Sequence, residues 1–200
     1  MKLKLLGRRI VLTRTHYAVV GLLVLLVFLV VAGLTIKTTP ALSGTQWLVL
    51  TEQDLQQFGM TRGMTSNGTD CQTEEQTSIN SLQVQYSFCN YTLNSLNNTE
   101  LIVELREFTN LEDRNGAYQY DSQHLYSIQG LLSENDYGDL SRFRVNNVND
   151  YGGNLNPPGV YFYHLWICKE LYLVHITSAG SKDARAYIAN IGRRILSKFG

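Results

Sequence analysis

The chain has 200 residues, 44% of them hydrophobic, and its 17 lysines and arginines balance 17 aspartates and glutamates. Five of the basic residues lie within residues 1–16, which contain no acid, and subtracting these five from the 17 leaves 12 basic against 17 acidic residues in the remainder. The remainder is therefore acidic and has no basic stripe, which argues against a nucleic-acid partner.

An uncharged apolar run covers residues 17–36 (YAVVGLLVLLVFLVVAGLTI). At about 1.5 Å per residue, a helix of this length crosses about 30 Å of hydrocarbon. A cleavable signal peptide has an apolar region of about 7–15 residues and a small-residue cleavage site. Residues 33–40 (GLTIKTTP) contain no such site. We therefore expect an uncleaved signal-anchor in the cell membrane, with a cleaved signal peptide as the alternative.

The basic residues set the orientation that we expect for this single-pass protein. Positively charged segments stay on the cytoplasmic side, so residues 1–16 form a cytoplasmic tail and residues 17–36 the transmembrane anchor. Residues 37–44 (KTTPALSG) form a short stalk, and residues 45–200 form one extracytoplasmic domain. A domain on so short a stalk works close to the membrane surface.

The first elements expected in this domain are short. Residues 46–50 are apolar enough for an edge strand. Thr51 is a helix N-cap with Asp54 three residues later, and Gly59 ends the helix. Residues 63–77 are polar and are expected to form an exposed loop.

The middle of the domain combines a hairpin and a helix. Residues 82–88 alternate apolar and polar positions, residues 101–105 repeat the pattern, and the intervening Asn-rich stretch predicts a β-hairpin. A helix then begins at Asn110, with Asp113 three residues later. The residues expected on its buried stripe are Leu111, Tyr118 and Leu125.

The last part of the chain is the most apolar. A turn at residues 137–139 leads into a strand at 142–145, and strands at 160–167 and 171–177 are joined tightly around 168–170. Ser181 is the expected cap of a final helix. Its predicted buried face consists of Ala184, Ile188, Ile191 and Ile195. The sum is an α+β fold: an antiparallel β-sheet domain in the order ββα-βββα, with the helices packed on one face.

Three cysteines are too few for a disulfide framework. In an oxidising outer compartment we expect a Cys71–Cys89 disulfide that ties the polar loop to the first hairpin strand, with Cys89 on the polar face of that strand. A bond closing such a loop contributes about 3 kcal/mol by chain entropy. Pairing of Cys168 with one of them, or with another chain, is the alternative.

Three N-glycosylation sequons lie in the outer domain, and they make a glycoprotein one expectation. Asn67 and Asn97 fall in predicted loops, whereas Asn90 falls in a predicted strand. A chain rich in Asn, Ser and Thr also contains about two sequons by chance, so the pattern alone does not decide their use.

Two histidines, His164 and His175, lie on the strands of the last hairpin. A turn at Cys168–Lys169 would place the two rings as diagonal neighbours, about 5–7 Å apart. Packing within the sheet is the first interpretation, and a metal pair is the alternative, for which no third ligand is visible. We predict no metal and no cofactor.

The last hairpin carries apolar residues on both faces, whereas a sheet with one solvated face alternates apolar and polar. Either the hairpin is the covered centre of the sheet, or its tyrosine-rich face binds a protein partner, because tyrosine offers apolar area with a polar tip. The loop 146–158 would border such a surface. The candidate partner-binding residues are Tyr151, Tyr161, Tyr163 and Tyr172.

No G-x-S-x-G, H-E-x-x-H or C-x-x-C motif occurs in the sequence. We therefore expect a membrane-anchored extracytoplasmic binding or assembly module without catalytic activity, such as an accessory subunit or surface component, that acts on a protein partner in or at the membrane. Two alternatives remain. One is an anchored hydrolase-like enzyme whose site is assembled from dispersed residues, and the other is a ligand-sensing ectodomain.

Overall fold

The computed structural model describes residues 2–5, 8–11, 44–63, 71–77, 83–123, 130–146 and 159–200. The chain divides into two compact units, Met1–Leu42 and Ser43–Gly200. The predicted anchor at 17–36 and the stalk up to residue 43 lie outside the described residues. Of the helices in the described ranges, none is both long and apolar enough to span a membrane. The expected anchor stays a prediction.

The first unit contains a small antiparallel pair, β1 (Lys2–Leu5) and β2 (Arg8–Val11). Lys2 is opposite Val11 and Leu5 is opposite Arg8, so the two strands form a hairpin. This hairpin within the basic segment was not predicted.

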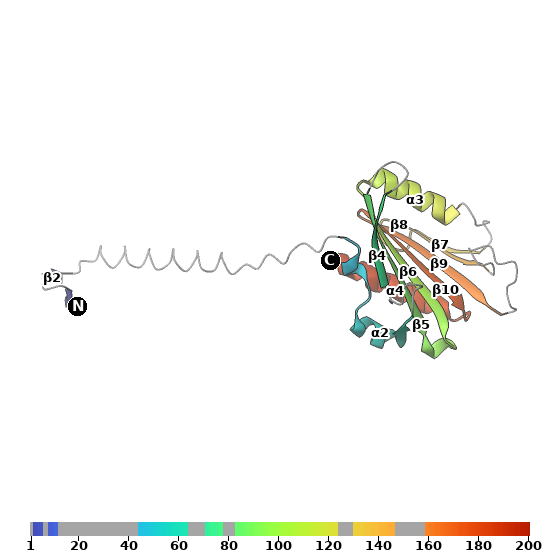
Figure 1. Cartoon of the computed structure of the whole chain (residues 1–200), viewed down its shortest axis with the longest axis horizontal. Helices are drawn as coiled ribbons and strands as arrows, with labels where there is room; N and C mark the ends of the chain where they lie inside the picture. The colour runs from blue at the N-terminus through green and yellow to red at the C-terminus, as the bar shows by residue number, and fades with distance from the viewer. Residues whose placement is uncertain are drawn as a thin grey trace. The chain divides into compact units, whose positions relative to one another are not determined.

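The second unit contains all other elements (Figure 1). In chain order these are η1 (Gln46–Leu48), α2 (Glu52–Phe58), β3 (Met60–Arg62), β4 (Cys71–Thr77), β5 (Gln83–Leu93), η2 (Asn94–Leu96), β6 (Thr99–Glu107), α3 (Leu111–Gln123), β7 (Leu131–Glu134), β8 (Leu140–Asn146), β9 (Tyr161–Lys169), β10 (Tyr172–Gly180), α4 (Ala184–Leu196) and η3 (Ser197–Phe199).

The strands of the second unit form one eight-stranded antiparallel sheet, in the order β3-β5-β6-β10-β9-β8-β7. Strand β4 pairs with β5 on the same edge as β3, further along the strand. The predicted α+β class is therefore confirmed. The hairpin β9–β10 lies at the centre of the sheet. This agrees with the interpretation in which both of its apolar faces are covered.

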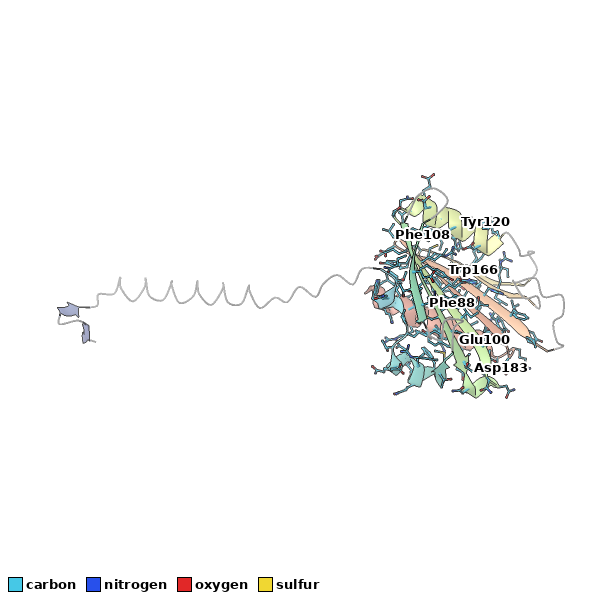
Figure 2. The ribbon with its side chains drawn as sticks, in the orientation of Figure 1. Phe88, Glu100, Phe108, Tyr120, Trp166 and Asp183 are labelled. Atoms are coloured by element: carbon cyan, nitrogen blue, oxygen red, sulfur yellow. A yellow bond between two sulfur atoms is a disulfide. The ribbon has the colours of Figure 1, made fainter. Side chains whose placement is uncertain are left out.

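The expectation that the helices share one face of the sheet was wrong. Helix α4 packs on one face, where Gly192 lies against Leu165 and Ile176. Helix α3 covers the other face, on which Tyr118 packs with Trp166. Figure 2 labels Trp166 and, on α3, Tyr120. Because β9 and β10 carry apolar residues on both faces, each face must be covered to keep them from water.

The predicted face of the last helix is confirmed, since Ala184, Ile188, Ile191 and Ile195 are fully buried. The helix begins at Ala184 rather than directly after Ser181. Ser181 instead forms a turn, in which its hydroxyl accepts a hydrogen bond from the Asp183 backbone N–H at 3.1 Å.

The first predicted helix is confirmed in detail. The Thr51 hydroxyl accepts from the Asp54 backbone N–H, Asp54 accepts from the Thr51 N–H, and Gly59 ends α2 with φ 62°. The edge strand predicted at 46–50 was wrong: this segment contains the single 3-10 turn η1 and buries Leu48 and Leu50 in the core. An apolar run of five residues does not distinguish a strand from a buried turn.

The disulfide Cys71–Cys89 is confirmed, but its setting differs from the expectation. Residues 71–77 form the edge strand β4 rather than a loop, and Cys71 lies directly opposite Cys89 in the ladder. Polar residues are common in edge strands, which is why the composition resembled a loop. Cys89 is fully buried, so it does not lie on a polar face.

Strand β5 has two faces with opposite environments. Cys89 and Tyr91 point into the core on the α4 side, whereas Tyr86 and Phe88 point to the α3 side and are half-buried. The alternation along this strand was predicted. However, the more deeply buried face is that of Cys89 and Tyr91, not the predicted apolar face with Tyr86 and Phe88.

Helix α3 begins as predicted, since the Asn110 side chain accepts from the Asp113 backbone N–H at 2.9 Å. Its predicted apolar stripe was wrong: Tyr118 is buried, but Leu111 is 52% exposed and Leu125 lies outside the described residues. Arginines join the helix to its surroundings instead. The pairs are Arg106–Asp121, Arg142–Ser122 and Arg114–Asp139.

The turn of the central hairpin consists of Glu170 and Leu171, two residues later than the predicted centre at Cys168–Lys169. Glu170 has φ 51° there. The turn shifts the register, so His164 is opposite Thr177 and Trp166 is opposite His175. Strand β8 confirms the strand predicted at 142–145, whereas β7 was not predicted.

Candidate functional site

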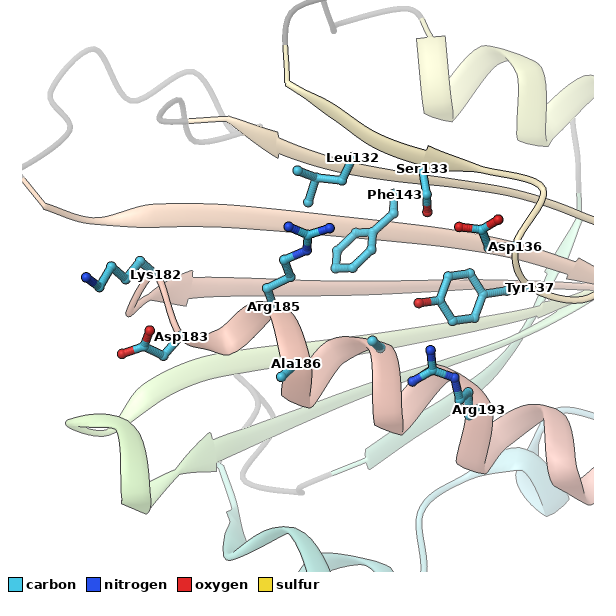
Figure 3. A pocket seen from close by; sticks show the side chains of 11 residues that line it. Leu132, Ser133, Asp136, Tyr137, Phe143, Lys182, Asp183, Arg185, Ala186 and Arg193 are labelled. Carbon is cyan, nitrogen blue, oxygen red and sulfur yellow. The ribbon is translucent and has the colours of Figure 1, made fainter.

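A groove of about 670 Å³ lies between the outer strands of the sheet and helix α4 (Figure 3). The strands and their turn contribute Leu132, Ser133, Asp136, Tyr137 and Phe143. The helix and the turn before it contribute Lys182, Asp183, Arg185, Ala186, Ala189 and Arg193. The groove is thus built from one sheet edge and one helix flank.

The floor of the groove is aromatic and fixed by packing. Tyr137 contacts Phe143 edge to face, with ring centroids 6.5 Å apart, and Phe143 contacts Tyr163 at 6.1 Å. Tyr163 donates a hydrogen bond to the Lys182 carbonyl at 2.7 Å, which joins this row of rings to the start of the helix. A floor of this kind keeps its shape whether the groove is empty or filled.

The helix side of the groove is basic. The Arg193 guanidinium lies 5.4 Å from the centre of the Tyr137 ring, and Figure 3 shows Arg185 extending from α4 toward β7 and β8. Within the described ranges, no ion pair joins Lys182, Arg185 or Arg193 to a carboxylate. Three cations therefore face an open groove that has two acids at its ends, Asp136 and Asp183.

On the opposite face of the sheet, which α3 covers, a chain of polar contacts crosses the four strands β5, β6, β10 and β9. His175 Nδ1 lies 2.6 Å from a Glu104 oxygen, and His175 Nε2 lies 3.3 Å from His164 Nδ1. Tyr86 donates to the other Glu104 oxygen at 2.7 Å. The Thr177 hydroxyl lies 3.0 Å from His175 Nε2.

The electrostatics of this chain follow from burial and contact. Burial by itself raises the pKa of Glu104, but the hydrogen bond and charge of His175, with Tyr86 and Arg106, lower it to about 2. Burial lowers the pKa of His164 well below its usual value, and the neighbouring His175 adds to this effect. At neutral pH, Glu104 is therefore charged and His164 is neutral.

This histidine pair is held by packing. The His164 and His175 rings stack with centroids 5.6 Å apart, and His175 also stacks on Trp166 at 4.6 Å. The diagonal arrangement was predicted, although the residues opposite each histidine were not. Glu104, the third group, comes from β6 and lies directly across from His175.

The three groups form a row rather than a cage, because His175 lies between Glu104 and His164 and directs one ring nitrogen to each. Across the described parts of the chain, no three His, Cys, Asp or Glu side chains are placed to hold one metal ion. The buried Cys168 is the free cysteine, and burial raises the pKa of its thiol to about 11, which makes it a poor nucleophile.

Two of the candidate tyrosines of the last hairpin are buried. Tyr163 and Tyr172 expose 6% and 7% of their surface, whereas Tyr161 is half-buried and stacks on Tyr163. Tyr172 donates to Glu107 at 2.8 Å and contacts the rings of Trp47 and Phe199. Contacts within the chain thus account for this aromatic face. Partner binding by these residues stays a prediction.

The other sequence-based candidates lie apart from the groove. Asn97 is exposed at the turn after η2 with φ 50°, and Asn90 lies within β5, where its side chain donates to Glu100 at 3.3 Å. Glycosylation of both stays a prediction. Tyr151 and Asn67 lie outside the described residues.

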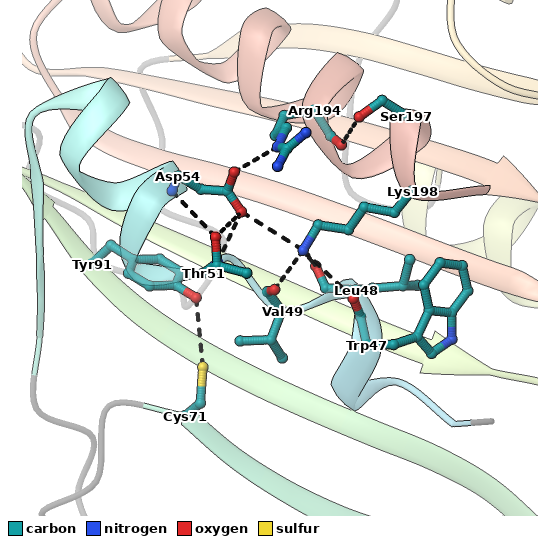
Figure 4. A network of polar contacts seen from close by, with 10 residues as sticks. All are labelled: Trp47, Leu48, Val49, Thr51, Asp54, Cys71, Tyr91, Arg194, Ser197 and Lys198. Carbon is teal, nitrogen blue, oxygen red and sulfur yellow. Dashed lines mark hydrogen bonds and ion pairs between the residues drawn. The ribbon is translucent and has the colours of Figure 1, made fainter. Parts of the chain in front are cut away.

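A second buried polar network joins residues 47–54 to residues 194–198 (Figure 4). The Asp54 side chain is 1% exposed and accepts from Arg194 at 2.5 Å, and the Lys198 ammonium lies 3.8 Å from it. Lys198 also donates to the Val49 carbonyl at 2.6 Å. Burial raises the pKa of Asp54, but the hydrogen bonds of Thr51 and Arg194 and the charge of Lys198 outweigh it and lower the pKa.

The sequence did not identify the groove or Glu104. The groove combines residues 132–143 with residues 182–193, and each set alone resembles an ordinary turn or a solvated helix flank. The closest available signal was Arg185 and Arg193 on a helix whose opposite face is apolar. Comparison with known protein families, with characterised proteins and with solved structures finds no match.

Proposed function

We propose that this chain is a membrane-anchored binding module whose outer domain holds a protein partner located in or at the same membrane. The apolar run 17–36 behind a basic tail supports the anchor, with the N-terminus in the cytoplasm. The short stalk 37–44 keeps the domain close to membrane neighbours. The proposal assigns binding rather than catalysis to the domain.

The observation that carries the proposal is the groove beside α4, in which an aromatic floor is surrounded by cations that form no ion pair with any described carboxylate. Aromatic and arginine side chains are the groups most enriched in protein-binding surfaces. A domain that used these cations for its own stability would pair them with carboxylates, as it pairs Arg194 with Asp54.

Site-specific crosslinking in intact membranes tests the proposal. A photoreactive amino acid replaces Ala189 in the groove of the full chain, and the matched control replaces Tyr120, which is 62% exposed on α3 at the opposite face. We expect the groove position to crosslink one integral-membrane or membrane-bound protein, and the control position to leave it unlabelled. Equal labelling from both positions, or none from Ala189, contradicts the proposal.

Protease accessibility in sealed cells tests the orientation. If residues 45–200 lie outside, protease added to sealed cells removes the outer domain and spares a fragment that contains the basic tail. Protection of the outer domain in sealed cells would reverse the orientation. In a host that glycosylates its secreted proteins, a mobility shift after glycosidase treatment would report use of Asn67, Asn90 or Asn97.

A hydrolase-like enzyme is the second candidate, and one observation favours it. Thr177, His175 and Glu104 stand in the order of a hydroxyl, an imidazole and a carboxylate, at 3.0 Å and 2.6 Å. This is the arrangement in which a base activates a nucleophile. However, β10 pairs with a strand on each side, so its backbone N–H groups are engaged in the two ladders and cannot stabilise an oxyanion there.

Hydrolysis of an activated ester separates the two functions. If the enzyme hypothesis holds, the full chain hydrolyses p-nitrophenyl acetate above background, and Thr177→Val abolishes the activity. We expect the parent chain and this variant to be equally inactive. Activity that depends on Thr177 would replace binding by catalysis as the proposed role.

A further inference from the structure

The groove lies against the β7 edge of the sheet. Among the described strands, β7 pairs with β8 alone, and it is the last strand in the order of the sheet. It is short, irregular between Leu131 and Ser133, and exposes 39% of Leu131. The outer backbone groups of such an edge can pair with another strand.

The basic flank of α4 faces this same edge. Leu132 and Ser133 of β7 line the groove together with Arg185, and Figure 3 shows the Arg185 side chain reaching toward that strand. A strand added to β7 would therefore direct alternate side chains toward a helix whose cations have no carboxylate partner within the described residues.

From this arrangement we infer that the groove binds an extended segment of a partner protein with one central acidic residue. The segment adds a strand to β7 and directs the carboxylate of that residue to Arg185. This inference rests on the proposed function and names the chemistry of the partner. Backbone pairing with β7 supplies affinity, and the contact between acid and guanidinium supplies selectivity.

The charges along the groove define where the carboxylate of the bound segment would lie. Asp136 stands near one end and Asp183 near the other, and both repel an acid placed beside them. Arg185 lies between these ends in Figure 3, so a single central acid is favoured over a run of acids. The aromatic floor formed by Tyr137 and Phe143 accepts an apolar side chain next to it.

Peptide binding to the full chain in detergent micelles tests the inference, with fluorescence anisotropy as the readout. The probe is a labelled ten-residue peptide of alternating valine and threonine with one central glutamate. The matched peptides carry glutamine or lysine in its place. We expect the glutamate peptide to bind tightest, and its affinity to fall as salt is added.

Two protein variants locate the binding site. Arg185→Glu should weaken the glutamate peptide by about fivefold or more and should favour the lysine peptide. The matched control is Arg62→Glu on β3, at the other edge of the sheet, which should leave both affinities unchanged. Equal effects of the two variants would overturn the inference.

The backbone of the peptide tests strand addition itself. N-methylation of alternate amides removes donors from one edge of the peptide, so one of the two methylation registers should abolish binding and the other should spare it. Equal affinities for both methylated peptides overturn the strand-addition model.

The outcomes also separate the inference from the proposed function. If the Ala189 crosslink forms but none of the peptides binds, the domain binds a partner of different chemistry, and the inference alone fails. If the crosslink is absent and the peptides do not bind, both fail.

Discussion

Glu104 shows how a partly buried carboxylate couples the stability of the sheet to pH. It accepts from Tyr86 and lies 2.6 Å from a ring nitrogen of His175, and these contacts hold its pKa at about 2, against a usual value of 4.5. A carboxylate with a lowered folded-state pKa stabilises the fold above its unfolded pKa. That contribution is lost as pH falls through the folded value.

The expected result is a loss of stability between about pH 4.5 and pH 2, because the unfolded chain binds a proton at Glu104 that the folded chain does not. Glu104→Gln should be less stable than the parent at pH 7 and should lose less stability across this window. Urea unfolding, followed by circular dichroism at several pH values, measures both. A parallel acid curve for parent and variant contradicts the assignment.

The matched control is Glu100→Gln, which removes a carboxylate from an exposed position of the same strand. Its acid curve should follow that of the parent. A change as large as that of the Glu104 variant would indicate a general charge effect instead.

Residue-level features were predictable where they are local. The Thr51–Asp54 capping box and the Asn110 cap depend on residues three apart, and both are confirmed. Glu104 was not identified, because its partner His175 is distant in the sequence and is brought opposite it only by the pairing of β6 with β10. Local patterns contain no information on that pairing.

At the scale of elements, the two sheet-facing helices differ in how they are attached. Helix α4 packs closely through Gly192, where an added Cβ would lie 2.9 Å from Leu165 Cδ2 and 3.0 Å from Ile167 Cδ1. In α3, an added Cβ at Gly116 meets nothing within 4 Å. The same substitution should therefore have opposite effects in the two helices.

We expect Gly192→Leu to destabilise the domain by about 2 kcal/mol, because it overpacks the contact between α4 and the sheet. Gly116→Leu should stabilise it by about 0.7 kcal/mol, because leucine favours the helix more than glycine does. Chemical denaturation of the two variants measures both changes. Destabilisation of similar size at both positions would show that α3 packs as tightly as α4.

The elements were predictable where the apolar period was regular. The four buried residues of α4 follow helical spacing, and Leu101, Val103 and Leu105 alternate along β6. The face covered by α3 was missed, because the helix is attached by arginine pairs and its sequence shows no clear apolar stripe. Strand β4 was missed because an edge strand needs little apolar surface.

At the scale of the molecule, the Asp54 network joins the start of the second unit to its last helix. The buried carboxylate pairs with Arg194 and Lys198, so residues 46–58 are attached across the core rather than by their own short helix. If the Asp54 carboxylate is removed, the half-buried Lys198 ammonium loses this anionic partner. It then keeps its hydrogen bonds to backbone carbonyls.

Asp54→Ala should therefore destabilise the second unit by about 2 to 3 kcal/mol, through loss of the ion pairs of a buried carboxylate and of a capping box. Hydrogen exchange should show the largest increase within residues 46–58. The matched control is Glu112→Ala, an exposed acid in the first turn of α3, which should change stability by less than about 0.5 kcal/mol. Similar losses for the two variants contradict the role of the network.

The fold class was predictable from the order of the elements, and the groove was not. The antiparallel sheet follows from alternating strands and short turns, whereas the groove requires β7, which was not predicted, to lie beside α4. The pairing order decides which strand is at the edge, and the sequence pattern does not state that order.

The pairing of β6 with β10 has a consequence for how the domain comes to be folded. The centre of the sheet forms only when Leu105 pairs with Val174, which lies 69 residues later in the chain (174 − 105). Pairing between strands so distant in sequence raises the contact order, so we expect folding to be slow. Until residues 172–180 have been synthesised, β6 can pair with β5 but lacks β10, so its second edge is open to aggregation. A slowly synthesised chain would spend that interval with this strand edge exposed, the state in which nascent chains engage chaperones.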